Sequence, residues 1–268
     1  MFKKYKGWLT ACALALFAWS GSSFASPVTV DGVTWNTSNP LDLTIQSINL
    51  RESSVSKVGD TLTGYGQIGS INGNNNFCSN CDLTFTFSYT VHSISGNAIV
   101  FDGGSFQFYV SSPGGYNVLD PSTAMNGTEW LTLSGHSFYN PSFGSTGDLF
   151  ATVTGTVADP LSGSNGYGLL DASGGAASPY LNTNSISDGH GGFADFSLNS
   201  SFQYFPAGGC TSVSTDPNSL CYYPIEGNGS LVGKSSVPEP AGAGMLGLGL
   251  GFLAFAMRRR RKESSTQA

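Results

Sequence analysis

Basic residues are scarce over most of this 268-residue chain. Of its 11 lysines and arginines, residues 26–237 hold three, Arg51, Lys57 and Lys234, against 15 acidic residues, so this stretch has a net charge of −12. Phosphate backbones and anionic lipids repel such a surface, which argues against nucleic acid as a partner. Two explanations fit the excess of acid: solubility outside the cell, or an acidic site for divalent cations.

No segment before residue 241 has a helical period, and the 36 glycines, with abundant Ser, Thr and Asn, favour turns over helix. Apolar and polar side chains instead alternate over 83–91, which predicts a strand with one buried face. The same pattern covers 149–157 and 196–204, and shorter candidate strands cover 41–50, 61–71, 105–110 and 129–138. We therefore predict one all-β domain, an antiparallel β-sandwich that is jelly-roll-like or concanavalin-like.

Glycine-containing pairs mark the expected turns. Gly96-Asn97 tolerates the positive φ of a tight hairpin, so the 83–91 strand is predicted to return through residues 98–101. Asn72-Gly73, Asn126-Gly127 and Asn165-Gly166 are further turn signals. The glycine-rich stretch 161–178 is predicted to be a long surface loop, a common place for binding residues on β scaffolds.

Four cysteines follow the N-terminal segment: Cys78, Cys81, Cys210 and Cys221. An even number in an exported protein favours disulfides. Three pairings are possible, of which Cys78 with Cys81 and Cys210 with Cys221 needs only local loops. The spacing of Cys78 and Cys81 also fits a redox pair or half of a zinc site, but its flanks are typical of loop and strand rather than of a helix N-terminus.

The same region holds three histidines, His92, His136 and His190. No local hydrolase signature accompanies any of them, so we interpret all three as surface residues. Asp188 and Asp195 flank a glycine-rich turn whose carbonyl oxygens can join them around a hard cation, which makes a weak candidate calcium site. A plain turn between strands explains the same composition, and no other cofactor is expected.

Aromatic residues make up 12% of the chain. Trp35, Trp130, Tyr116, Tyr167 and Tyr180 lie in or near predicted loops, and exposed rings stack well on the faces of sugars. The alternative is burial, because most aromatic residues of a β-sandwich belong to its core.

Both ends of the chain have features of targeting segments. Lys3, Lys4 and Lys6 precede an apolar stretch and then small residues, so residues 1–25 are predicted to be a secretory signal peptide that is cut before Ser26. Cys12 loosely fits a lipid-attachment site, but the run between Lys6 and Cys12 is too short for that route.

The C-terminal targeting segment is a short apolar span. Residues 241–257 carry no charge and include five glycines. A helix of this length spans about 25 Å, less than a hydrocarbon core of about 30 Å, so it is a marginal anchor. By the positive-inside rule, the arginines that follow keep their end in the cytoplasm: Arg258, Arg259, Arg260 and Arg261. We divide the chain into a signal peptide (1–25), a β-sandwich domain (26–230), a linker (231–240), a transmembrane helix (241–257) and a basic cytoplasmic tail (258–268).

Val237, Pro238, Glu239 and Pro240 come directly before that span. Together with the glycine-rich span and the terminal arginines, they resemble the PEP-CTERM sorting signal of Gram-negative bacteria. The resemblance implies that an exosortase, a membrane-embedded protease, recognises residues 238–240 and removes the tail, in systems linked to exopolysaccharide and biofilm. A retained single-pass anchor with a proline-punctuated linker is the alternative.

These features favour an exported, non-enzymatic protein that is anchored transiently in the inner membrane and then reaches the outer surface or extracellular matrix. Its expected partners are an exosortase and extracellular polysaccharide. Two other functions remain open on the sequence alone. One is a carbohydrate-binding, lectin-like adhesion module, and the other is a secreted hydrolase, which for glycosides would need two carboxylates facing each other across a cleft.

Overall fold

The computed structural model describes residues 27–37 and 43–236, and their regular structure is mainly β. The strands are β1 Val28–Val30, β2 Val33–Trp35, β3 Leu43–Glu52, β4 Thr61–Ile71, β5 Asp82–Ser95, β6 Ala98–Ser111, β7 Thr128–Gly135, β8 Phe138–Asn140, β9 Ser145–Gly147, β10 Leu149–Thr152, β11 Gly155–Thr156, β12 Asp159–Pro160, β13 Ser164–Gly174, β14 Ile186–Ser187, β15 Phe193–Ala194, β16 Phe196–Tyr204 and β17 Ile225–Gly233. The helical elements are η1 Pro121–Met125, α2 Ser178–Leu181 and η2 Leu220–Tyr222.

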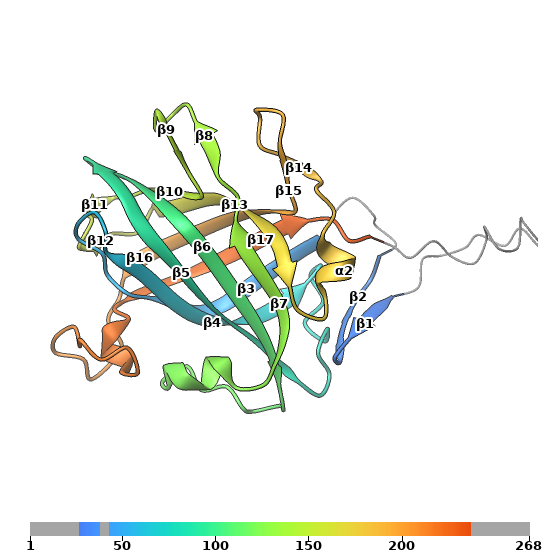
Figure 1. Ribbon diagram of the computed structural model, residues 1–268. Helices are drawn as coiled ribbons and strands as arrows, with labels where there is room; N and C mark the ends of the chain where they lie inside the picture. The colour runs from blue at the N-terminus through green and yellow to red at the C-terminus, as the bar shows by residue number, and fades with distance from the viewer. Residues whose placement is uncertain (1–26, 38–42, 237–268) are drawn as a thin grey trace, which may run out of the picture. The chain divides into compact units, whose positions relative to one another are not determined.

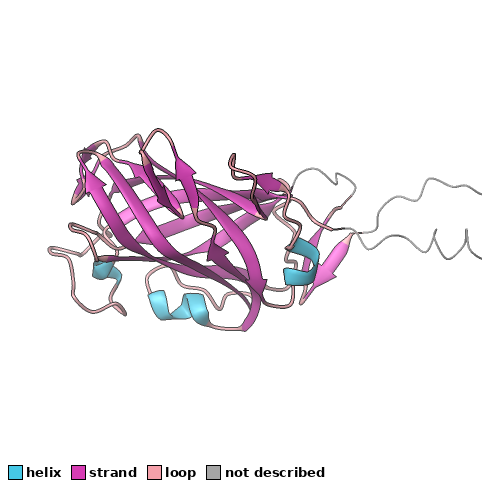
Figure 2. Ribbon diagram, turned by 45° about the horizontal axis from the view of Figure 1, so that its top comes forward, coloured by secondary structure: helices cyan, strands magenta, loops and turns pink. Residues whose placement is uncertain are grey.

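The main sheet closes into an eight-strand antiparallel barrel (Figures 1 and 2). β3, β4, β5 and β6 are consecutive neighbours, β13, β16 and β17 continue the wall, and β17 pairs with β3. One position in the wall is shared by two strands. β10 pairs with the first part of β6 and β7 with its last part, and both also pair with β13. Between these two strands the chain leaves the wall to form the β8–β9 hairpin.

The all-β prediction is confirmed, but the predicted β-sandwich is wrong. Alternation of apolar and polar residues is the same in a sandwich and a barrel, because both bury one face of each strand. Closure requires strongly curved strands. β-bulges interrupt the pairing of β3, β5, β6 and β13, and such bulges bend strands and increase their twist.

β5 supplies much of the barrel core. Its inward side chains are all buried: Leu83, Phe85, Phe87, Tyr89 and Val91. They pack against the aromatic side chains of β6, with the rings of Phe87 and Phe106 stacked 5.0 Å apart. Burial of each such ring contributes roughly 2–3 kcal/mol, so this cluster is a main source of stability.

Two glycines of β4 make room for these rings. A Cβ atom on Gly66 would come within 2.7 Å of the Phe85 ring, and one on Gly64 would collide with the Phe87 ring. The rings lie over bare backbone of the neighbouring strand, an arrangement that needs glycine in the strand interior.

The β1–β2 hairpin and α2 lie at one end of the barrel (Figure 1). The hairpin turns at Asp31 and Gly32, which have φ angles of 50° and 87°. It packs Trp35 against Trp130 of β7, with ring centroids 5.9 Å apart. Trp130 Nε1 also donates a hydrogen bond to the Val30 carbonyl at 3.2 Å. These indoles extend the core at this end of the barrel.

Disulfides link Cys78 to Cys81 and Cys210 to Cys221. The prediction of disulfides is confirmed, and the pairing is the local one of the three possibilities. The first bond lies in the β4–β5 connection and the second in the long β16–β17 connection. Because disulfide sulfurs are not thiolates, this oxidised pair does not ligate zinc. A disulfide is also the oxidised state of a redox pair, so the redox alternative stays an untested prediction.

The glycine-rich stretch 161–178 is not the predicted surface loop. Most of it is β13, which pairs with β7, β10 and β16, and Asn165-Gly166 lies within this strand rather than at a turn. A Cβ atom on Gly166 would come within 2.7 Å of Ser200 Oγ, and one on Gly168 within 2.7 Å of the Asp148 carbonyl. These glycines therefore permit close packing of neighbouring strands. The prediction of a loop was wrong because it took the same glycines as a sign of turns.

Two predicted boundaries also shift. The strand predicted over 149–157 ends at Thr152, and β17 continues to Gly233, past the domain boundary predicted at residue 230. Within residues 27–37 and 43–236, no helix is both long enough and apolar enough to span a membrane. The predicted signal peptide, the transmembrane segment and the basic tail lie outside the described residues.

Candidate functional site

Two hairpins, β8–β9 and β14–β15, project beside each other from the barrel wall (Figure 1). Phe138 of the first and Ala194 of the second are buried against outward-facing residues of the wall, among them Phe150 and Leu169. Because side chains alternate along a strand, their neighbours Tyr139 and Phe193 face away from this contact.

The outer side chains of these hairpins form what we call the hairpin patch: Tyr139, His190 and Phe193. Tyr139 is 44% exposed and Phe193 is 52% exposed. His190 Nε2 lies 3.1 Å from the Tyr139 carbonyl oxygen, and the two rings are 5.7 Å apart. The patch therefore combines exposed rings with a hydrogen-bonding imidazole on two hairpins that contact each other.

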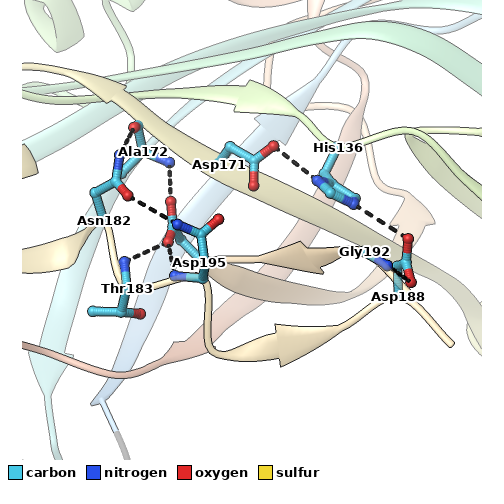
Figure 3. Close-up of polar contacts among 9 residues, drawn as sticks. His136, Asp171, Ala172, Asn182, Thr183, Asp188, Gly192 and Asp195 are labelled. Atoms are coloured by element: carbon cyan, nitrogen blue, oxygen red, sulfur yellow. Dashed lines mark hydrogen bonds and ion pairs between the residues drawn. The ribbon is translucent and has the colours of Figure 1, made fainter. Parts of the chain in front are cut away.

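His136 lies beneath these hairpins, between two carboxylates (Figure 3). It follows the last residue of β7, and its backbone N–H donates to the Leu169 carbonyl at 2.9 Å. Its Nδ1 lies 2.8 Å from Asp171 Oδ2, and its Nε2 lies 3.7 Å from Asp188 Oδ2. The His136 side chain is 18% exposed, so the prediction of a surface residue is wrong at this position.

Asp188 holds the turn of the β14–β15 hairpin. Its Oδ1 accepts hydrogen bonds from the backbone N–H groups of His190 at 2.7 Å and Gly192 at 2.9 Å. These bonds, that of His190 first, lower the pKa of the Asp188 carboxyl, with a smaller contribution from His136. The ionised carboxylate thus links the hairpin turn to the barrel wall through His136.

Asp195 is buried between β15 and β16 and caps a different loop (Figure 3). Its Oδ2 accepts from the Ala172 N–H at 2.7 Å, and its Oδ1 accepts from the N–H groups of Thr183 at 2.5 Å and Asn184 at 2.6 Å. One carboxylate thus satisfies three backbone donors, of which that of Ala172 is buried and those of Thr183 and Asn184 are partly buried, and it fixes this loop against β13.

The predicted calcium ligands therefore have separate partners: Asp188 faces His136 and its own turn, whereas Asp195 faces the Thr183 loop. Within the ranges that the structure describes, no three His, Cys, Asp or Glu side chains come together as a metal-binding group. Calcium binding stays an untested prediction, and a cation at either carboxylate would have to compete with the backbone donors it already has.

The other two histidines are exposed, as predicted. His92 pairs with Asp102, with Nδ1 and Oδ2 2.5 Å apart, on the outer face of the β5–β6 hairpin. In the described part of the chain, the contacts of all three histidines are to carboxylates and to the Tyr139 carbonyl and ring rather than to a hydroxyl or thiol. The histidines thus organise turns and surface pairs.

The aromatic residues chosen from the sequence are mostly not accessible. Trp35 and Trp130 are buried, Tyr116 and Tyr180 are half-buried, and Tyr167 is 37% exposed on β13. The exposed Tyr139 and Phe193 were missed. Each of them is next in sequence to a buried residue of the same short strand, Phe138 for Tyr139 and Ala194 for Phe193. This alternation of inward and outward side chains is the sequence signal that could have identified them.

The described residues form a β-barrel domain that has two disulfides and two hairpins on its wall. Residues 236–261 match the family model described as the PEP-CTERM protein-sorting motif. Searches of curated proteins and of solved structures each find no significant match to the chain.

The chain therefore carries a PEP-CTERM sorting motif at its C-terminus, as the resemblance of Val237, Pro238, Glu239 and Pro240 predicted. This motif implies an exported protein that an exosortase sorts and processes, and PEP-CTERM proteins are sorted to the cell surface.

Proposed function

We propose that this protein is a non-enzymatic component of the cell surface or extracellular matrix, associated with exopolysaccharide or biofilm. The observation that carries the proposal is the sorting motif at 236–261, because it implies sorting to the cell surface. The two disulfides and the scarcity of basic residues suit an oxidising, hydrated exterior.

Culture fractionation tests this proposal. We expect the native protein in the surface or matrix fraction, with an intact mass that lacks the C-terminal tail, and we expect it to leave that fraction when the polysaccharide is stripped. Purified protein incubated with the polysaccharide should release no new reducing ends. Full-length protein in the inner membrane contradicts the location, and released reducing ends contradict the non-enzymatic role.

A lectin-like adhesion module is the second candidate, and the hairpin patch favours it. Tyr139 and Phe193 present exposed rings, and the Tyr139 ring lies close to the imidazole of His190. Sugars bind to sites of this composition, where a ring covers the apolar face of the pyranose and a polar group accepts or donates to its hydroxyls.

A glycan array with a double variant separates the two candidates. Specific binding to a defined glycan that falls at least roughly tenfold in Tyr139→Ser/Phe193→Ser supports the lectin role, because about 1.4 kcal/mol of ring contact is then lost. Leu119→Ser is the matched control, since Leu119 is also exposed but lies away from the hairpins, in the connection before η1. Equal binding by both variants removes the patch from the interaction.

A further inference from the structure

The barrel interior holds a partly open cavity of about 70 Å³ that runs along β3 from Ile45 to the strand's last residue, Glu52, at one end of the barrel. Strands from all round the wall line it, and the lining is mainly aliphatic and aromatic, with Phe85, Phe87, Phe101, Phe106 and Phe108 among its side chains. This end, marked by the β11–β12 hairpin in Figure 1, is opposite to the β1–β2 hairpin. The cavity belongs to neither the hairpin patch nor the sorting motif.

One carboxyl group lines this apolar cavity. Glu52, the last residue of β3, is buried and turns inward between Gly64 of β4 and Ile225 of β17. In the part of the chain that the structure describes, its carboxyl has no hydrogen-bond or ion-pair partner. The neighbouring Arg51 points outward instead, where its guanidinium pairs with Glu226 at 3.2 Å. A buried carboxyl without a partner is costly, so its site favours an occupant that can pair with it.

Water fits this site poorly. A buried water usually makes about three hydrogen bonds, whereas apolar cavities remain dry. Of the lining hydroxyls, Ser47 Oγ already donates to the Gly229 carbonyl at 3.1 Å and accepts from the Gly229 N–H at 2.7 Å. Ser53 Oγ likewise accepts from the Thr63 N–H at 2.9 Å. The Tyr89 hydroxyl also belongs to a lining residue and has no hydrogen-bond partner, but most of the lining is apolar and offers water nothing to bond to.

Size, charge and access each restrict the occupant. An apolar cavity of about 150 Å³ holds benzene, so a volume of about 70 Å³ suits a slimmer, unbranched chain. An anionic head group would meet Glu52 and a domain with 15 acidic and three basic residues, whereas a cationic one would be attracted. Exposed apolar side chains lie in loops at this end of the barrel, as expected around an entrance for apolar molecules: Val58, Leu161, Phe205 and Val213.

We propose that the barrel interior binds a small, unbranched hydrophobic amine, with its alkyl chain among the phenylalanine rings and its ammonium group at the Glu52 carboxylate. The ammonium satisfies the buried carboxylate, and the carboxylate in turn compensates for desolvation of the ammonium. This binding site goes beyond the proposed surface role and does not depend on it.

Titration calorimetry at pH 8 with butylamine, hexylamine and octylamine, and with hexanoate as the anionic counterpart, tests the site. We expect saturable binding of an amine, tighter by at least tenfold than that of hexanoate. Glu52→Gln keeps the shape of the side chain but removes its charge, and it should weaken amine binding at least tenfold. Glu226→Gln removes an acid from the outer face of the adjacent strand and should leave binding unchanged.

A pH series on the unmodified protein gives a second, independent test. Of the side chains that line the cavity, Glu52 and Tyr89 can ionise. Burial raises the pKa of Glu52 to about 7, and it raises that of Tyr89 far above its ordinary range. Because an alkylammonium group stays charged throughout, affinity should fall between pH 8 and pH 5 as Glu52 takes up a proton.

Several results would overturn the proposal: no saturable binding of any amine by the wild-type protein, hexanoate binding as tightly as hexylamine, or Glu52→Gln binding the amine as well as Glu226→Gln does. Should Glu52→Gln fail to fold, the pH series decides, since an amine affinity that stays constant from pH 8 to pH 5 excludes a role for the Glu52 charge.

Discussion

A single buried carboxyl, Glu52, makes stability depend on pH near neutrality. Burial raises its pKa from 4.5 in the unfolded chain to about 7 in the barrel. Between these values the folded protein keeps a proton that the unfolded chain releases. The stabilisation is therefore complete below pH 4.5 and is lost as the pH rises through 7, by on the order of 3 kcal/mol. Urea unfolding at pH 4.5 and pH 8 measures this change.

The matched variant for this prediction is Glu52→Gln, because it has no carboxyl to titrate. The quantity to compare is the difference in unfolding free energy between wild type and variant, because every other ionisable group is common to both proteins. Asp60 and Asp188 have lowered pKa values, so their contributions are lost only below pH 3.8 and do not interfere. A difference that is the same at pH 4.5 and pH 8 would show that burial of Glu52 does not shift its titration.

Asp195 is the polar residue on which the loop beside β13 depends most. Asp195→Ala leaves the N–H groups of Ala172, Thr183 and Asn184 without their acceptor. The buried Ala172 donor should cost roughly 1–3 kcal/mol when unsatisfied, whereas the other two donors are partly exposed and can bond to water, so the free energy of unfolding should fall by about 2–3 kcal/mol. Denaturant unfolding measures it, with the exposed Asp159→Ala as control. A loss equal to that of the control would mean that water replaces the carboxylate at no cost.

At the scale of strands, the local pattern in the sequence predicts where β5 and β16 lie, because each alternates apolar and polar residues over much of its length, and it marks β4 as a shorter candidate strand. It does not predict β13, since its glycines at 166 and 168 are the same residue type that marks turns. Nor does it predict closure into a barrel, which depends on β13 meeting β7 and β10 across a long sequence separation. Pairing of distant strands leaves no mark in either strand alone.

The close packing of β5 side chains over β4 predicts that one added methyl group on β4 destabilises the barrel. Gly66→Ala places a Cβ atom within 2.7 Å of the Phe85 ring and 3.3 Å of the Leu50 Cα. Overpacking of this kind should lower the free energy of unfolding by about 2–3 kcal/mol. Thermal and urea unfolding of Gly66→Ala can be compared with Gly208→Ala, whose added Cβ meets nothing within 4 Å. Equal stability of the two variants would show that the aromatic cluster yields easily and that β4 does not need glycine.

At the scale of the whole molecule, the sequence and the structure describe complementary parts. The sorting motif could be predicted because its recognition depends on a linear order of residues. The hairpin patch and the barrel cavity could not, because each depends on how distant strands come together. His190 meets Tyr139 across 51 residues, and Glu52 lies beside Ile225. Removal of the predicted signal peptide together with the C-terminal tail would leave residues 26–237 with their net charge of −12.

Substitutions in the sorting motif test whether exosortase removes the C-terminal tail. Glu239 is the acidic residue of the motif, between Pro238 and Pro240, and the other acid outside residues 26–237 is Glu263, in the tail. If exosortase recognises the Pro238–Glu239–Pro240 segment, Glu239→Ala should reduce processing at least roughly tenfold. A tenfold reduction corresponds to a loss of about 1.4 kcal/mol of recognition free energy. The protein then stays in the membrane fraction with residues 241–268 attached, whereas Glu263→Ala is processed normally. Intact mass spectrometry of both fractions gives the ratio, and efficient processing of Glu239→Ala would show that the protease recognises the tail without this carboxylate.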